Sequence, residues 1–425
     1  MIATIIVSFV VLLLVGTPIA LLLLATTALA LVFHSPTSLL ILPQQLFNAL
    51  DNSVLMSVPF FILAGNIMTR GSMARHLIDV VNCLVGGYPG GLAIATTLAC
   101  LFFASLSGSS PATGVAIGSI RLPALLKAGY EDRFSIGLVT SAGSLGIVIP
   151  PSIPMILYCL VMNVSVAELF LAGIIPGLLI GGVFIAYTIV MSYQRQWRVV
   201  EKASWSDTAR ALRRGIWALI LPVIVLGGIY GGVFTPTEAA AVSVTYALMV
   251  EIIISKEIKL RDVPSVCMEG AILSGCLLFI LACAMTLVWL LTSERIPQHL
   301  ADIITAHVQS RCVFLVMDNI LFLLIGAVMD NVSAMLILSP LFVETLNRFQ
   351  IDYVQYGIIM VLLIEYGFLT PPFGLNLFVA MGISKKSLIE VTAGVAPFLV
   401  LLLGCVLLVT FVPSISLILP KLFIR

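Results

Sequence analysis

The sequence predicts an all-α polytopic membrane protein with an inverted-topology repeat, two re-entrant helical hairpins and two broken helices. Three observations predict this fold: an extreme composition, motifs that occur twice, and an uneven placement of Lys and Arg. Hydrophobic residues make up 60% of the 425-residue chain and charged residues 10%, whereas a soluble domain is about half apolar and about a quarter charged. Most of the surface must therefore face lipid.

Short motifs recur in the same order in the two halves of the chain. The segment G-F-L-T-P-P at Gly367 repeats the layout of G-I-V-I-P-P at Gly146, and 371 − 150 gives an offset of 221 residues between the Pro-Pro pairs. Two further pairs are Thr17 and Thr235, each followed by Pro (235 − 17 = 218), and the HLIDVV and HLADII motifs at His76 and His299 (299 − 76 = 223). The offsets predict two repeats, residues 1–193 and 216–425, joined by a polar, basic linker at 194–215. A duplicated membrane fold is typical of transporters.

Ten apolar stretches are candidate spans, five in each repeat. A helix that crosses the apolar part of a bilayer needs about 20 residues, so the first and sixth stretches are short and must tilt or re-enter. The stretches are residues 2–15, 18–33, 55–68, 134–162 and 166–193 in the first repeat, and 216–231, 236–254, 272–291, 354–382 and 388–412 in the second.

Two further apolar stretches are interrupted near the middle by polar residues. Gly108-Ser109-Ser110-Pro111 divides the first, and Asp330-Asn331 divides the second. We interpret them as hairpins, at about 90–127 and 311–347, that enter the membrane and leave on the same side. The broken helices follow at about 131–162 and 354–382. Amphipathic segments at 71–85 and 294–308 are predicted to be arm helices along the membrane interface.

The placement of the 21 Lys and Arg residues predicts the orientation. If the 194–215 linker is cytoplasmic, 16 of them fall inside and five fall outside, as the positive-inside rule requires. The N-terminus is then periplasmic. Since five spans are an odd number, the second repeat is upside down relative to the first, which is the symmetry of alternating access. The five outside residues are Arg295, Arg311, Arg348, Lys421 and Arg425.

Four polar segments lie inside the predicted membrane region. They are LSGSSPAT from Leu106, GIVIPPS from Gly146, GAVMDNVSA from Gly326 and GFLTPPFG from Gly367. Adjacent prolines remove two amide donors and leave carbonyl groups of the preceding turn without partners. Carbonyl and hydroxyl oxygens are ligands for a hard cation such as Na⁺, while half-helix N-termini offer partial positive charge to an anion. Irregular backbone at this depth is tolerated only against protein or a water-filled site.

Acidic residues inside a membrane are functional candidates because they are costly there. Asp330 is predicted to act as an ion ligand, a substrate neighbour or a gate. For Glu238 two interpretations stay open, a role in transport and a capping role behind Thr235-Pro236. Glu365 and Asp318 remain undecided between structural and functional roles.

Other classes of function fit the sequence less well. The chain contains no G-x-x-x-x-G-K-[ST] motif, so it is not expected to use ATP itself. An intramembrane enzyme would need a catalytic constellation, yet no histidine falls in a hairpin or a broken helix. A passive ion or solute channel stays an alternative, because hairpins from opposite faces also build pores. No organic cofactor is expected.

These segments, with TPTEAAA at Thr235 and VPFFILAG at Val58, resemble the large membrane subunit of tripartite ATP-independent periplasmic (TRAP) transporters along the whole chain. The resemblance implies an elevator-type secondary transporter in the bacterial inner membrane. It also implies Na⁺-coupled uptake of an organic acid (a C4-dicarboxylate, a sugar acid or sialic acid), a periplasmic substrate-binding protein that delivers it, and a small four-span partner subunit.

The resemblance also implies site residues. It places one Na⁺ site at Ser107, Gly146, Ile149 and Pro151, and a second at Gly326, Gly367, Thr370 and Phe373. Residues predicted to bind substrate or to act in transport are Ser109, Ser110, Asp330, Asn331, Glu238, Pro150 and Pro371. Some relatives carry an acidic residue just past the first hairpin tip, where this chain has Pro111-Ala112-Thr113. This departure leaves the substrate class open.

Overall fold

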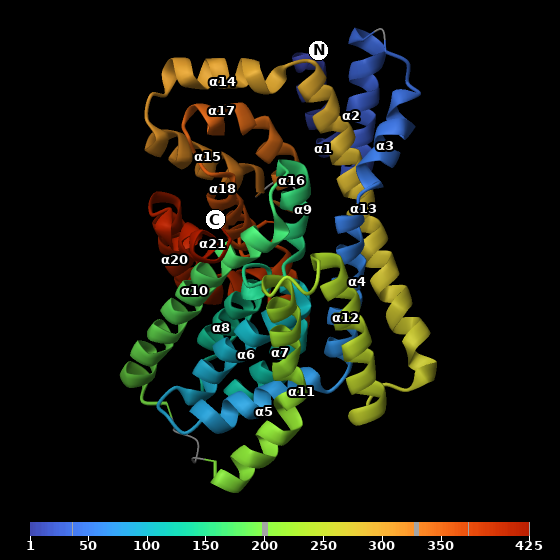
Figure 1. Cartoon of the computed structure of the whole chain (residues 1–425). Coiled ribbons are helices and arrows are strands. Elements are labelled where there is room, and N and C mark those ends of the chain that lie inside the picture. Colours follow the sequence, from blue (N-terminus) through green and yellow to red (C-terminus); the bar gives the residue numbers. More distant parts are fainter. Residues whose placement is uncertain (36, 198–202, 327–330, 373, 425) are drawn as a thin grey trace.

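The computed structural model describes residues 1–35, 37–197, 203–326, 331–372 and 374–424, and these are helical without any strand (Figure 1). Through residue 195 the helices are α1 (Ile2–Leu14), α2 (Ile19–His34), α3 (Ile41–Leu50), η1 (Ser53–Met56), α4 (Ser57–Arg70), α5 (Met73–Val85), α6 (Gly91–Ser107), α7 (Ser110–Lys127), α8 (Asp132–Ser144), η2 (Leu145–Ile147), α9 (Ile153–Met162) and α10 (Val166–Arg195).

The helices after residue 203 follow a similar order. They are α11 (Trp205–Tyr230), α12 (Pro236–Met249), η3 (Val250–Ile254), η4 (Leu260–Asp262), α13 (Val263–Ser293), α14 (Ile296–His307), α15 (Arg311–Gly326), α16 (Asn331–Leu341), α17 (Val343–Arg348), α18 (Tyr353–Phe368), α19 (Leu375–Ser384), α20 (Leu388–Phe411) and α21 (Ser414–Phe423).

Six helical stretches of the described chain are long and apolar enough to cross a membrane, namely Ser53–Arg70, Val166–Arg195, Trp205–Tyr230, Pro236–Ile254, Leu260–Ser293 and Leu388–Phe411. The other predicted spans are shorter helices. Those at 134–162 and 354–382 are each divided into two helices.

The helix breaks lie where Gly and Pro interrupt the apolar pattern. Gly108 separates α6 from α7 with φ +59°, a conformation that residues with a side chain rarely adopt. The segment between α8 and α9 contains the cis peptide bond Pro150–Pro151, and the segment between α18 and α19 contains the cis bond Pro371–Pro372. In the described residues, the first predicted hairpin is thus two helices, α6 and α7, joined by a short irregular segment, and each predicted broken helix is divided at its Pro-Pro pair.

Helix ends match across the two halves. Asn163 and Lys385 end α9 and α19 in the left-handed conformation (385 − 163 = 222). Ser165 and Ser387 cap α10 and α20 by accepting a hydrogen bond from the backbone N–H of the Glu three residues later (387 − 165 = 222). The same local signals thus end and begin corresponding helices at one offset.

Two parts of the structure differ from the sequence expectation. The second part of the predicted linker at 194–215 is helical, since α11 already begins at Trp205. Ser204 starts this helix by accepting a hydrogen bond from the backbone N–H of Asp207. Short helices α3 and α21 were not predicted. Each has only ten residues, too few for the hydrophobic period to stand out.

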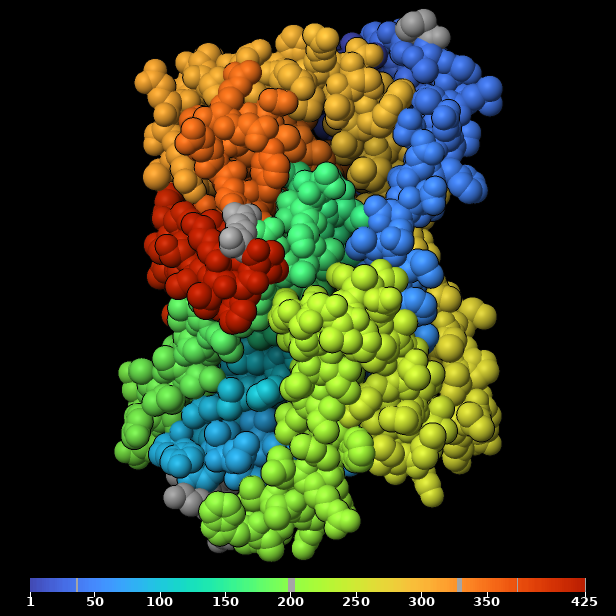
Figure 2. Space-filling model, in the orientation of Figure 1, coloured from blue at the N-terminus to red at the C-terminus, as the bar shows by residue number. Residues whose placement is uncertain are grey.

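The packing places the arm helices across opposite ends of the molecule. In Figure 1, α14 lies across one end and α5 across the other, roughly perpendicular to the long helices. Helix α4 packs against α12 and α13, α5 against α11, and α8 against α7 and α20. Figure 2 shows α12 and α13 (yellow) with the N-terminal helices (blue) along one side, and α10 (green) with the C-terminal helices (red) along the other. The broken helices lie between these sides.

Candidate functional site

The tip of the α6–α7 hairpin is a compact cluster of oxygen atoms. Ser107, at the end of α6, is 1% exposed, and its Oγ lies 2.9 Å from Oγ1 of Thr113. Thr113 Oγ1 donates to the carbonyl oxygen of Ser109 at 2.9 Å, and the backbone N–H of Ser109 donates to Ser107 Oγ at 3.4 Å. The broken turn is thus stabilised by hydroxyl groups in place of helix hydrogen bonds.

The first broken helix packs directly on this tip. A methyl group on Gly146 would lie 2.6 Å from the carbonyl oxygen of Ser109 and 2.7 Å from Thr113 Oγ1. A methyl group on Gly108 would lie 2.7 Å from the carbonyl oxygen of Pro151, and the backbone N–H of Ile153 donates to the Gly108 carbonyl at 3.3 Å. The structure therefore brings the first predicted Na⁺ residues together.

Ile149, the remaining residue of that predicted set, directs its side chain away from the tip. Its Cγ1 would lie 2.6 Å from a methyl group on Gly177 of α10, so the side chain fills the space that this glycine leaves. Pro150 and Pro151 are buried, and Ile149 is half-buried. Only backbone atoms of Ile149 are then suitable as ion ligands.

The second cluster is centred on the side chain of Asn331. Its Oδ1 would lie 2.0 Å from a methyl group on Gly326 and 2.3 Å from one on Gly367, so the amide occupies a cradle that only glycines leave open. Asn331 is 4% exposed, and within the described part of the chain its Oδ1 has no hydrogen-bond partner. A buried oxygen without a donor is a suitable cation ligand.

Thr370 completes the described part of this cluster. Its Oγ1 donates to the carbonyl oxygen of Tyr366 at 2.8 Å, and its backbone N–H donates to the Gly367 carbonyl at 3.1 Å. Pro371 follows in the segment between α18 and α19. Two predicted site residues, Asp330 and Phe373, lie outside the described residues.

Two hydrogen bonds join the halves between these clusters. Ser144 Oγ lies 2.8 Å from Oε1 of Glu365, and the two residues are themselves 221 positions apart. Each stands two positions before the glycine at which its helix breaks, Gly146 or Gly367. Asn376 Nδ2, on the first turn of α19, donates to Ser110 Oγ on the first turn of α7. The two hairpin and broken-helix pairs thus meet.

A cavity of about 480 Å³ lies beside the hairpin tip. Its lining includes the first turns of four helices, at Ser110 of α7, Ile153 of α9, Val332 of α16 and Leu375 of α19. The facing wall comes from Asn66 and Thr69 of α4 and from Leu273 and Leu277 of α13. The cavity therefore separates the broken helices from the long helices α4 and α13.

The electrostatics of this cavity come from the backbone. Its described lining contains no Lys or Arg, whereas the N-terminus of each α-helix carries about half a positive charge. Four such termini favour an anionic group without a basic side chain. No group of three or more His, Cys, Asp or Glu side chains that could hold a metal ion occurs among the described residues.

The remaining candidates lie elsewhere. Glu238 is an exposed residue whose Oε2 accepts hydrogen bonds from the N–H and the hydroxyl of Thr235, a capping box at the start of α12, and it does not line the cavity. Asp318 is buried in α15 and accepts a hydrogen bond from Tyr356 Oη at 3.2 Å. Arg121 is buried and donates to Thr96, Asn82 and the Leu92 carbonyl.

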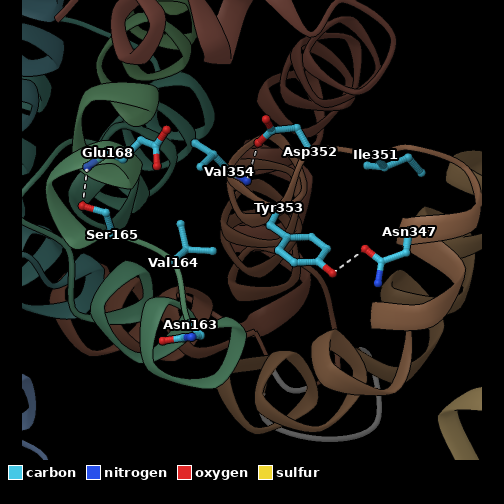
Figure 3. Close-up of a pocket in the computed structure, with 9 residues that line it drawn as sticks. All are labelled: Asn163, Val164, Ser165, Glu168, Asn347, Ile351, Asp352, Tyr353 and Val354. Atoms are coloured by element: carbon cyan, nitrogen blue, oxygen red, sulfur yellow. Dashed lines mark hydrogen bonds between the residues drawn. The ribbon is translucent and has the colours of Figure 1, made fainter. Parts of the chain in front are cut away.

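A second pocket, of about 390 Å³, lies where α9 and α17 end and α10 and α18 begin. Figure 3 shows Tyr353 directed toward Asn347, whose Oδ1 accepts its hydroxyl hydrogen bond at 2.6 Å, and Ser165 capping Glu168. None of the sequence-predicted site residues lines this pocket.

Sequence reasoning missed Asn376, Thr113 and Ser144. Thr113 and Asn376 stand within or beside recognised motifs, so their positions carried a signal. The partner of Asn376 lies 266 residues away and that of Ser144 lies 221 residues away, and only the fold reveals such contacts.

Comparison with known proteins identifies relatives over nearly the whole chain. Residues 6–415 match the family described as the tripartite ATP-independent periplasmic transporter, DctM component. The chain is 41% identical to the C4-dicarboxylate TRAP transporter large permease protein DctM of Pseudomonas aeruginosa, over 93% of this chain and 92% of that protein. It is 38% identical to the ectoine/5-hydroxyectoine TRAP transporter large permease protein UehC of Ruegeria pomeroyi, over 99% of both chains.

The fold is also similar to a solved structure, the YdaH transporter of Alcanivorax borkumensis. The similarity has a TM-score of 0.66 at 17% sequence identity and covers 95% of this chain and 98% of that chain. The relatives are transporter permeases and not enzymes, and their family is independent of ATP. Together with its apolar helices, this makes the chain a multi-pass inner-membrane protein of secondary transport. The chain belongs to the DctM family, the large permease component of tripartite ATP-independent periplasmic transporters.

Proposed function

We propose that this chain performs Na⁺-coupled secondary active uptake of a carboxylate-bearing small molecule by an elevator type of alternating access. The observation that supports the proposal is that the two halves are joined by hydrogen bonds, Ser144 to Glu365 and Asn376 to Ser110, close to a cavity lined by the first turns of α7, α9, α16 and α19. Ser107, Gly108 and Gly146 belong to one hairpin and broken-helix pair, and Asn331 and Gly367 belong to the other.

Na⁺ would bind at each pair. At the first, the ligands would be Ser107 together with backbone carbonyls of Gly146, Ile149 and Pro151. At the second, they would be carbonyls of Gly326 and Gly367, Thr370 and Phe373, with Asn331 Oδ1 supplying an oxygen that has no partner among the described residues. Carbonyl oxygens carry partial negative charge, so Na⁺ would draw the carbonyls of each site toward one point and organise both sites.

The substrate would place its carboxylate at the four helix N-termini of the cavity. Ser109 and Ser110 line the cavity and can donate hydroxyl hydrogen bonds. Four other predicted residues stand close in sequence to residues of the lining, namely Asp330, Asn331, Pro150 and Pro371. Glu238 would act indirectly, through the start of α12. The names of two relatives specify C4-dicarboxylate and ectoine transport. For this chain we propose an organic acid among C4-dicarboxylates, sugar acids and sialic acid.

During transport one domain would move relative to a fixed scaffold, and the cavity would lie at the boundary between them. The re-entrant hairpins α6–α7 and α15–α17 and the broken helices α8–α9 and α18–α19 would form the mobile transport domain. Helices α4, α12 and α13 would belong to the scaffold, and the arm helices α5 and α14 would connect the two. A loaded domain would cross the membrane with Na⁺ and substrate together.

The family description names a tripartite system of which this chain is one component. We propose that the other two are a small four-span membrane subunit, which would extend the scaffold, and a periplasmic substrate-binding protein, which would deliver the acid.

Uptake into proteoliposomes tests the proposal. The vesicles would contain this chain with its small subunit, and radiolabelled succinate, gluconate and N-acetylneuraminate would be added separately with the binding protein. An inward Na⁺ gradient should drive one acid above its outside concentration, and an equal K⁺ gradient should not. Equilibration of the acid without accumulation would indicate a channel, and the absence of any Na⁺ effect would refute the coupling.

A further inference from the structure

The elbow between span α4 and arm helix α5 is held by a carboxylate from a distant helix. Helix α4 ends at Arg70, and α5 begins at Met73, so only Gly71 and Ser72 form the elbow. The side chain of Glu251 reaches this elbow from η3, the π-helical turn that follows α12. A π-helical turn within a helix frequently marks a functional position.

Glu251 makes four hydrogen bonds there and is completely buried. Its Oε1 accepts from the backbone N–H groups of Ser72 and Met73, both at 2.9 Å. Its Oε2 accepts from the N–H of Ser72 at 2.9 Å and from the hydroxyl of Ser72 at 3.1 Å. The carboxylate thus satisfies N–H groups that the first turn of α5 cannot satisfy by itself, and its charge complements the helix dipole.

Gly71 is the residue that makes this contact sterically possible. A methyl group there would lie 2.1 to 2.5 Å from the carboxyl atoms of Glu251. The backbone carbonyl of Glu251 is also held, because the N–H groups of Glu257 and Ile258 donate to it at 3.0 and 3.3 Å. Both ends of the contact are therefore fixed.

The opposite arm has a different elbow. Arg295, at the start of α14, has φ +56° and no side-chain capping hydrogen bond, and its N–H donates to the nearby Thr292 carbonyl. At the α5 elbow a buried side chain joins two helices that are about 180 residues apart in sequence, with 251 − 72 = 179. At the α14 elbow the described hydrogen bonds are local.

We propose that Glu251 is the pivot of the α5 arm, a positioning residue that fixes the α4–α5 elbow to α12 while the far end of the arm follows the hairpin. The inference rests on the proposed elevator movement. A carboxylate at the start of a helix allows small changes in helix direction, because several N–H donors share two oxygens. Losing it would leave the Na⁺ and substrate sites intact and slow the movement between states.

Uptake kinetics of reconstituted variants test this pivot. The probe is whichever of succinate, gluconate and N-acetylneuraminate the wild-type transporter accumulates. E251A should lower the maximal rate about tenfold and leave the apparent KM for Na⁺ and for the acid nearly unchanged. G71A should slow transport similarly, because its methyl group displaces the carboxylate. In the G71A/E251A double variant the two losses should not add, since both remove one contact.

The matched control is E269Q. Glu269 forms an exposed ion pair with Arg70 beside the same elbow and is 51% exposed, so its loss should leave uptake unchanged. A maximal rate of E251A equal to wild type would overturn the pivot, as would additive losses in the double variant or a KM that rises with the rate loss. If the wild-type protein accumulates none of the acids, the proposed function itself fails, which is a distinguishable result.

Discussion

Gly146 carries the closest contact at the first hairpin tip. A methyl group there would lie 2.6 Å from the Ser109 carbonyl oxygen, and real Cβ atoms do not approach backbone so closely. We predict that G146A separates the tip from the broken helix and lowers the stabilisation of the protein by Na⁺ to the part that the second site contributes. Thermal unfolding of the purified protein across a Na⁺ titration measures this effect.

A glycine in open space provides the control for G146A. Gly182, in α10, has no atom within 4 Å of a methyl group built on it, and Ala is favoured over Gly inside a helix. G182A should therefore keep the wild-type Na⁺ response and unfold at an equal or higher temperature. An unchanged Na⁺ response in G146A would show that Na⁺ does not bind at the first cluster.

Asn331 is the described side chain between the glycines of the second site. N331A removes an oxygen that lies within a cradle formed by Gly326 and Gly367. We predict that the half-saturating Na⁺ concentration for uptake rises at least tenfold, equivalent to about 1.4 kcal/mol of binding free energy. N331D, which keeps the oxygen, should retain more of the affinity. Equal Na⁺ dependence in N331A and wild type would argue against this ligand.

At the residue scale, sequence motifs marked the segments that contain the candidate site, because small residues and prolines interrupt apolar runs at a repeated offset. The choice of Ser107, Gly146 and Pro151 within those segments came from the family resemblance and stays a prediction. Glu251 could not be singled out, because its place near the end of the 236–254 apolar stretch gives no hint that it reaches Ser72. Asn376 was missed for the same reason: its partner Ser110 is on another helix of the other half.

At the element scale, the helix breaks were predictable and several helix starts were not. Gly108 beside Ser-Ser-Pro and the Pro-Pro pairs disfavour a continuous helix, so their effect is local and visible in the sequence. The start of α11 depends on Ser204 and Asp207, a capping pair in a polar segment that resembles a linker. The division into two inverted repeats remains a prediction, supported by the matched helix ends.

Re-entrance of the hairpins is a prediction at this scale. Both ends of hairpin α6–α7 should lie on the cytoplasmic side, and both ends of hairpin α15–α17 on the outside. Labelling of single cysteines with an impermeant thiol reagent reports the side on which each hairpin end lies. The cysteines would stand at Tyr88 and Lys127 for the first hairpin and at Cys312 and Arg348 for the second, in a background without the other native cysteines. Labelling of the two members of one pair from opposite sides would mean that the segment crosses the membrane.

At the scale of the whole molecule, charge placement predicts the orientation. A tag after Ala203, at the start of the second half, should be accessible only from the cytoplasm, and a tag at Gly232 between α11 and α12 only from outside. Protease protection in right-side-out and inverted vesicles measures both positions. Reversed accessibility would invert the predicted direction of transport.

The all-helical architecture with several apolar helices follows from composition and helix breaks together, and the similarity to the YdaH fold, at 17% identity, agrees with it. Composition could not predict that the two halves contact each other at their broken helices, because this depends on contacts such as the Ser144–Glu365 hydrogen bond. These contacts join the helices that carry the two oxygen clusters, and such a link is what coupled binding of two ions would require.

Equilibrium binding of radioactive Na⁺ to the purified protein tests that central claim most directly, because it counts the ions without requiring the substrate. We predict at least two Na⁺ per wild-type chain, one fewer in G146A, and two fewer when Gly367 is also replaced by Ala. Absence of Na⁺ binding to the wild-type protein, or an unchanged number of ions in both variants, would contradict the account.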